Sequence, residues 1–153
     1  MSCPEQNDDL AWLLQRNAHR LRNALDGLAV KHGLEGGFRD YVLLMLLESE
    51  APQTQIELGQ LAQVDKTTLM ASLDLLEAAG IVERKLNPTN RRVRTPVLTA
   101  KGKKVLKAVS AARKASEELP GMSATELKTL RALLVKLDAA CEAAGMKTPG
   151  SCM

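Results

Sequence analysis

Aromatic residues are scarce in this chain. Of its 153 residues only Trp12, Phe38 and Tyr41 are aromatic, although hydrophobic residues as a class make up 45%. A core of this composition has to be built from leucine, alanine, valine and methionine, which favours packed helices over a β-sandwich. The lack of rings also argues against binding of RNA or single-stranded DNA, where bases stack on aromatic side chains.

Long apolar runs are missing as well. The longest, residues 41–47, falls well short of the roughly 18 residues that a membrane-spanning helix needs. The first nine residues, MSCPEQNDD, are polar and acidic and do not resemble a signal peptide. We therefore expect a soluble cytoplasmic protein with no membrane partner.

Cysteine and histidine are too few and too scattered for a disulfide framework or a metal site. Cys3, Cys141 and Cys152 form no CxxC pair, and neither His19 nor His32 lies at a ligand spacing from them. The chain also has no nucleophile–base pair and no phosphate-binding glycine loop. We therefore expect no metal, no cofactor and no enzymatic activity, and treat a thiol switch as a lesser alternative.

What the sequence does contain is a series of helical patterns. Leucines spaced three, four or seven residues apart predict a helix over 8–31, with Asn7 or Asp8 as its N-cap. A nearly all-apolar segment predicts a buried helix over 38–48. Towards the C-terminus, a helix over 100–118 and another to about residue 144 are predicted; Thr99 would cap the first, and Ser123 with Glu126 forms a capping box for the second.

Residues 56–102 carry the most informative pattern. A helix capped by Thr54 ends near Gln63, and a second helix runs from Asp65 to about Ala79, where Gly80 supplies a left-handed stop. Two β-rich runs follow, at residues 81–86 and 93–98, around a tip that contains proline and asparagine. Two helices with an appended hairpin have a shape that fits a DNA groove and its phosphates.

Positive charge gathers in the same segment. Nine basic residues lie between Glu83 and Lys107 against one acidic residue, so this segment carries +8 while the whole chain carries +3. A basic segment against an acidic remainder indicates an electrostatic footprint for a polyanion. A solvated basic face is the alternative, but the position directly behind a helix-turn-helix pattern favours DNA.

The second helix of this pattern separates into two faces. Leu69, Leu73 and Leu76 would face the core. We predict that the remaining positions of its first turns, together with the arginines of the hairpin, contact DNA: Lys66, Thr67, Thr68, Met70, Ala71, Ser72, Arg84, Arg91, Arg92 and Arg94.

The first and the last two predicted helices each carry an apolar stripe, and one small lobe is not large enough to cover all three. We expect them to pack against a second copy of the chain, which would present two reading helices to a palindromic operator in double-stranded DNA. The alternative is that they fold back and complete a monomeric core. The expected organisation is one domain over 1–153, with dimerisation helices at about 8–34 and 100–144 and a DNA-binding lobe at about 38–99.

A series of short motifs follows in a fixed order along this chain: Leu58 with Leu61 and Ala62, then Asp65 to Thr68, Leu76 to Arg84, Asn90-Arg91-Arg92 and Leu98 to Gly102. In this order the motifs resemble the MarR family of winged helix-turn-helix transcription regulators. The resemblance is strongest from about residue 55 to 102 and follows the helix layout over about 8–144.

This resemblance implies a mainly α fold with a small β-hairpin wing, working as a dimeric repressor that a small-molecule ligand relieves. It implies that Arg92 enters the minor groove. The chain departs from the pattern at Asn90, where the family commonly has an aspartate that holds an arginine. It also departs at Met70 and Ala71, where serine and arginine are frequent.

The resemblance further implies a ligand cavity between the dimerisation helices and the DNA-binding lobe. An aromatic or phenolic effector would suit a lining of Trp12, Arg16, His19, Phe38, Tyr41 and Met45, although simple core packing explains these residues equally well. Two functional alternatives remain on the same fold. One is a thiol-based oxidant sensor. Hydroperoxide-sensing members of the family carry a cysteine early in the first helix, and the comparable residues 10–14 contain none, which disfavours this alternative. The other is a winged helix used only for protein contacts, disfavoured by the basic wing.

Overall fold

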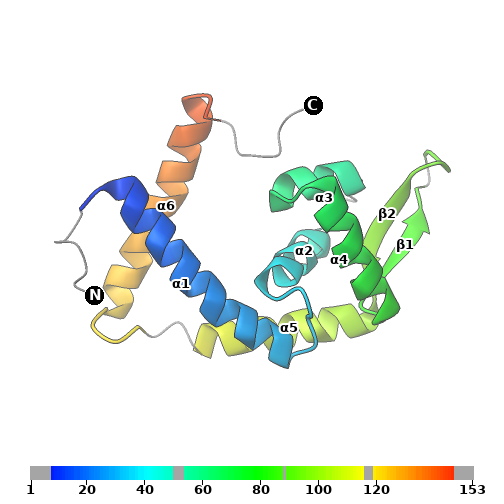
Figure 1. The fold of residues 1–153 in the computed structure, drawn as a ribbon, viewed down its shortest axis with the longest axis horizontal. Coiled ribbons are helices and arrows are strands. Elements are labelled where there is room, and N and C mark those ends of the chain that lie inside the picture. The colour runs from blue at the N-terminus through cyan, green and yellow to red at the C-terminus, as the bar shows by residue number, and fades with distance from the viewer. Residues whose placement is uncertain (1–7, 50–53, 88, 116–118, 147–153) are drawn as a thin grey trace.

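The computed structural model describes residues 8–49, 54–87, 89–115 and 119–146 and, within them, is mainly helical with one two-stranded antiparallel hairpin (Figure 1). The predicted fold class is confirmed. The elements in chain order are α1 (Leu10–Lys31), α2 (Phe38–Glu48), α3 (Gln55–Ala62), α4 (Lys66–Ala78), β1 (Val82–Leu86), β2 (Arg94–Leu98), α5 (Ala100–Ala115) and α6 (Ala124–Ala143).

Side-chain caps set most of the helix starts. Thr54 caps α3 as predicted, and Ser123 forms the predicted capping box of α6. At both sites the cap hydroxyl accepts from the N3 backbone N–H while the N3 glutamate accepts from the cap backbone N–H. The predicted cap of α1 is wrong by one residue. Asp9 accepts from Trp12 N at 2.8 Å, whereas Asp8 does not cap the helix and Asn7 lies outside the described residues.

The core lies in one lobe formed by α2, α3, α4, the hairpin and the adjoining parts of α1 and α5. Its fully buried side chains are mostly leucines, among them Leu43, Leu44, Leu58, Leu73 and Leu106. No methionine of the described residues belongs to this core, so the methionine predicted there is not found. The lobe holds α4 and the hairpin on one side, in the positions of a helix-turn-helix and its wing (Figure 1).

A network of backbone contacts joins the end of α4 to the start of α5. Thr99 Oγ1 donates to the carbonyl of Gly80 at 2.7 Å, and Lys101 Nζ donates to the carbonyl of Ala79 at 2.6 Å. A Cβ on Gly102 would overlap the carbonyl oxygen of Ile81, so only glycine permits this approach. The end of α4, the start of β1 and the start of α5 therefore form one tightly packed junction.

Helix α6 stands apart from the lobe and buries none of its side chains (Figure 1). Leu133 is 58% exposed and Val135 is 71% exposed. The N-terminal part of α1 is open too, with Leu10 at 61%. Among the described helices none combines the length and apolar character required to cross a membrane.

Candidate nucleic-acid interface and adjoining cavity

Asp65 fixes the N-terminus of α4. Its carboxylate accepts from Thr68 N at 3.0 Å and from Thr68 Oγ1 at 2.6 Å. The hydrogen bond from the Thr68 hydroxyl, and to a smaller extent that from the Thr68 amide, lowers the pKa of Asp65 below its ordinary value. Lys66 and Thr67 are exposed beside this cap. Their side chains are therefore available at the helix end, where the dipole also favours phosphate.

The outer face of α4 is narrower than the sequence prediction. Ala71 is exposed and Met70 is half-buried, but Ser72 is 1% exposed. The predicted placement of Ser72 on the DNA side is wrong, because it follows Leu69 by three residues and adjoins Leu73, and so lies on the buried stripe. Thr68 is half-buried, and its hydroxyl is already donated to Asp65.

The hairpin pairs β1 and β2 in register, from Val82 opposite Leu98 to Leu86 opposite Arg94. Its tip is held by asparagine side chains. Asn87 Oδ1 accepts from Thr89 N at 2.9 Å, and Asn90 Oδ1 accepts from Arg92 N at 3.1 Å. At this position Asn90 therefore supports the backbone of the tip, not a guanidinium group.

The arginines of the wing divide into two kinds. Arg91, Arg92 and Arg94 are exposed, so their charges are accessible to a phosphate. Arg84 differs, because its side chain is only 14% exposed and its guanidinium bridges Asp74 at 2.5 Å and Glu77 at 3.3 Å. The predicted DNA contact of Arg84 does not agree with this placement, since its charge is spent on joining β1 to α4.

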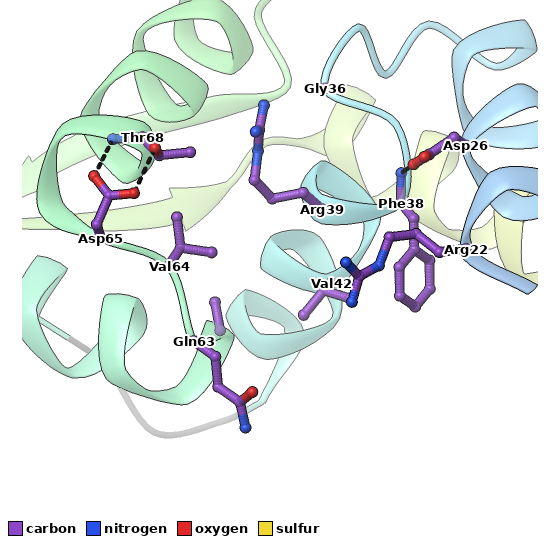
Figure 2. A pocket seen from close by; sticks show the side chains of 11 residues that line it. Arg22, Asp26, Gly36, Phe38, Arg39, Val42, Gln63, Val64, Asp65 and Thr68 are labelled. Atoms are coloured by element: carbon purple, nitrogen blue, oxygen red, sulfur yellow. Dashed lines mark hydrogen bonds between the residues drawn. The ribbon is translucent and has the colours of Figure 1, made fainter. Parts of the chain in front are cut away.

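A cavity of about 410 Å³ lies between α1, α2 and the turn that leads into α4 (Figure 2). Its lining comes from all three: Arg22, Asp26, Gly36, Phe38, Arg39, Val42, Ala62, Gln63, Val64, Asp65 and Thr68. One wall of the cavity is thus the capped first turn of the helix that would read DNA.

The two arginines of this cavity have fewer hydrogen-bond and ion-pair partners than its two aspartates. Asp26 accepts from Phe38 N at 2.7 Å, and Asp65 is occupied by Thr68. Arg22, in contrast, makes no hydrogen bond or ion pair with any residue that the structure describes, and Arg39 approaches a carboxylate, that of Asp40, only at 3.8 Å. With Val42 and Phe38 beside them (Figure 2), these guanidinium groups suit a small anion with an apolar part.

The predicted ligand residues are not brought together at this cavity. Only Phe38 lines it. Tyr41 is buried, with its hydroxyl 3.2 Å from Ser110 Oγ, and Met45 is 43% exposed. Trp12, Arg16 and His19 lie in the N-terminal part of α1, whereas this cavity is lined by residues 22 and 26 of that helix. A ligand site formed by the six predicted residues therefore stays a prediction, separate from this cavity.

Arg22, Asp26, Arg39 and Val42 were missed from the sequence. One signal was present, since Arg22 and Asp26 are four residues apart and share a helix face. The approach of this face to Phe38 depends on the turn at Gly37, which has φ of 65° and has no such signal. Cys141 is half-buried on α6, and Cys3 and Cys152 lie outside the described residues. Within the described ranges no cluster of three or more potential metal ligands occurs.

Comparison with known proteins agrees with this geometry. The model of the MarR family matches residues 32–93, which span α2, α3, α4, β1 and most of the wing tip. Among solved structures, MarR superposes with a TM-score of 0.80 at 24% identity, over 94% of this chain and 99% of that one.

Two further structures were solved with ligands. CouR from Rhodococcus jostii RHA1, bound to p-coumaroyl-CoA, matches with a TM-score of 0.70 at 26% identity, over 85% of this chain and 92% of that one. A Mycobacterium tuberculosis MarR family protein in complex with p-aminosalicylic acid matches with a TM-score of 0.70 at 26% identity, over 84% and 98%.

Proposed function

We propose that this chain is a MarR-like dimeric repressor that binds a palindromic site in double-stranded DNA and is released by a small organic anion. The MarR family model matches residues 32–93, and the chain shares the fold of MarR. It would act in the cytoplasm as a regulator, not as an enzyme. The observation that carries the proposal is the exposed first turn of α4 beside an exposed wing with three arginines.

DNA contact is supported by the chemistry of two exposed sites, the N-terminus of α4 and the tip of the wing. Lys66 and Thr67 lie at a helix N-terminus, the part of a reading helix whose side chains reach base edges. Arg92 lies at the wing tip, where a planar, weakly hydrated guanidinium suits a narrow minor groove. In this proposal α4 reads sequence in the major groove and the wing reads shape and phosphate.

Dimerisation is supported by the apolar surface of α1 and α6. Leu10, Leu133 and Val135 are more than half exposed in the single chain. Apolar stripes of this length on helices that frame a lobe are covered when a two-fold partner supplies the same surface. Residues 8–34 and 100–144 would then form the dimer, and the DNA-binding lobe at 38–99 would occur twice.

An effector site is supported by the cavity beside α4. Arg22 and Arg39 offer positive charge, and Phe38 and Val42 offer apolar surface. The ligands of the two related structures, p-coumaroyl-CoA and p-aminosalicylic acid, both combine an aromatic ring with an anionic group. We propose an effector of the same class here.

Selection of bound sequences from a random duplex pool tests the function. We expect enrichment of one palindrome, and binding to it that weakens with salt. If two wings and two helix ends neutralise about six to ten phosphates, affinity falls by about 10³–10⁵ between 50 and 200 mM salt. Failure to enrich any sequence, with a flat salt dependence, would refute the proposal.

The effector is tested on the selected duplex by titration with p-aminosalicylate and with its uncharged carboxamide as a matched control. We expect the carboxylate to release DNA and the amide to do so more weakly. Arg22→Gln should remove this difference without changing the mass of the dimer. Equal action of both compounds on the parent would refute an anion site.

A further inference from the structure

Asp40 is a buried carboxylate at the start of α2. It is 1% exposed, and its Oδ2 accepts from Gly36 N at 2.7 Å. The contact is so close that a Cβ on Gly36 would overlap the carboxyl group. Asp40 therefore closes the corner between α1 and α2, and its charge is withheld from water.

Two other polar groups influence the carboxyl group of Asp40. Arg39 Nε lies 3.8 Å from Asp40 Oδ1, and the hydroxyl of Ser72 on α4 lowers the pKa of this carboxyl group. Yet Arg39 Nε, Asp40 Oδ1 and Ser72 Oγ are all buried without a hydrogen bond of ordinary geometry. Such atoms cost free energy when they remain unpaired, so this cluster is sensitive to a change in any of its three groups.

Burial is the largest influence on Asp40, and the pKa of this carboxyl group lies above its ordinary value. Burial raises the pKa of Asp40, and the Gly36 amide, the Arg39 charge and the Ser72 hydroxyl lower it, while Glu35 raises it. Among these groups Arg39 supplies the nearest full positive charge. Loss of that charge would leave a buried carboxylate uncompensated, and a buried ion without its partner destabilises the structure around it.

Arg39 belongs to both neighbourhoods. Its side chain is 40% exposed and lines the cavity, with the guanidinium between Gly36 and the start of α4 (Figure 2). An anion in the cavity would compete with Asp40 for this guanidinium. Across the carboxyl group lies α4, which contributes Ser72 in its middle and Leu75 and Leu76 one turn further on.

We propose that Asp40 is a positioning residue for α4, and that it transmits to this helix, through Ser72, whether the guanidinium of Arg39 is available. This inference rests on the proposed function, because it describes how an anion in the cavity would act on the helix that reads DNA. It assigns the regulatory path to three residues outside the DNA surface.

A double-mutant cycle tests this path without any effector. Arg39→Gln removes the charge as a captured anion would. Asp40→Asn removes the group that depends on that charge, and keeps a carbonyl oxygen for the Gly36 amide. The parent, both single variants and the double variant are compared by hydrogen exchange of the α4 amides and by affinity for random duplex DNA at low salt. Arg20→Gln removes a charge from an exposed position on α1 and serves as the control.

We expect Arg39→Gln to speed exchange in α4 by about three- to tenfold and to weaken DNA binding by a similar factor. Adding Asp40→Asn should restore both to nearly the level of Asp40→Asn alone, because no buried charge then remains to be compensated. Ser72→Ala should likewise reduce the effect of Arg39→Gln. Arg20→Gln should leave exchange in α4 unchanged.

Additive effects in the cycle would overturn the proposal, since a merely structural role of each residue predicts addition and not rescue. An unchanged α4 in Arg39→Gln would overturn it as well. If the parent fails to bind duplex DNA, the proposed function fails, while the exchange cycle still decides whether Asp40 couples the cavity to α4.

Discussion

The substitution Arg84→Met tests whether Arg84 contacts DNA or instead holds the hairpin against α4. From its position in the basic segment Arg84 is a predicted DNA contact, but its guanidinium joins β1 to α4 through Asp74 and Glu77. Methionine keeps much of the unbranched stem, which packs where the side chain is 14% exposed, and removes only the charge and its hydrogen bonds.

The expected loss of stability is modest. Both partner carboxylates are open to solvent, at 62% and 41%, so each ion pair contributes only about 0.2–1 kcal/mol. Together they stabilise the fold by about 1 kcal/mol, and their removal lowers the melting temperature by about 2–4 °C for a chain of this size. Thermal unfolding followed by circular dichroism measures this change.

The salt dependence of DNA binding gives the decisive readout. If Arg84 holds the wing, Arg84→Met weakens DNA binding but leaves the salt slope unchanged. Arg94→Met is the matched control, because Arg94 is exposed on the paired strand. We expect it to reduce the salt slope by about 1 for each phosphate that the variant no longer neutralises, at unchanged stability. A reduced slope in Arg84→Met, with no loss of stability, would refute the reasoning.

Three other changes test the fold. Gly102→Ala would force a methyl group against the carbonyl oxygen of Ile81, so we expect a loss of about 1–3 kcal/mol in denaturant unfolding; full stability would mean that the junction relaxes. Leu134→Glu on α6, where this leucine is 41% exposed, should halve the mass seen in sedimentation; an unchanged dimer would place the interface elsewhere. Because hydrogen bonds lower the pKa of Asp65, its contribution to stability is present above its ordinary pKa of 3.8 and is lost as the pH falls through the lower folded value. Asp65→Asn should remove this acid-side loss from pH-dependent melting curves, and an identical pH profile would contradict it.

Local rules predicted much of the fold. The cap at Thr54, the capping box of Ser123, the stop at Gly80 and the two β-rich runs are short-range features, and the structure has all of them. The same rules held a clue that the prediction overlooked. Ser72 shares the three- and four-residue spacing of Leu69 and Leu76 and is buried with them.

The rest depends on contacts between distant segments. Asp40 sits in an apolar helix, and only the fold of the α1–α2 corner shows that its carboxyl group is enclosed and meets Gly36. The partners of Arg84 lie ten and seven residues away on another element. From the sequence its charge therefore suggested a DNA contact, whereas in the structure it forms ion pairs within the protein. The cavity requires three segments at once, and no local pattern encodes that meeting.

The junction between α4, β1 and α5 has a mechanical consequence. Thr99, Lys101 and Gly102 attach the start of α5 to the end of α4, so a rotation of α5 would carry α4 and the hairpin with it. Helix α5 has 16 residues and is therefore about 24 Å long. Over such a lever arm, a tilt of about 5° displaces the attached end by about 2 Å, more than half the length of a hydrogen bond. A small rotation about the far end of α5 would thus displace α4 and the hairpin far enough to move them out of position relative to a DNA groove.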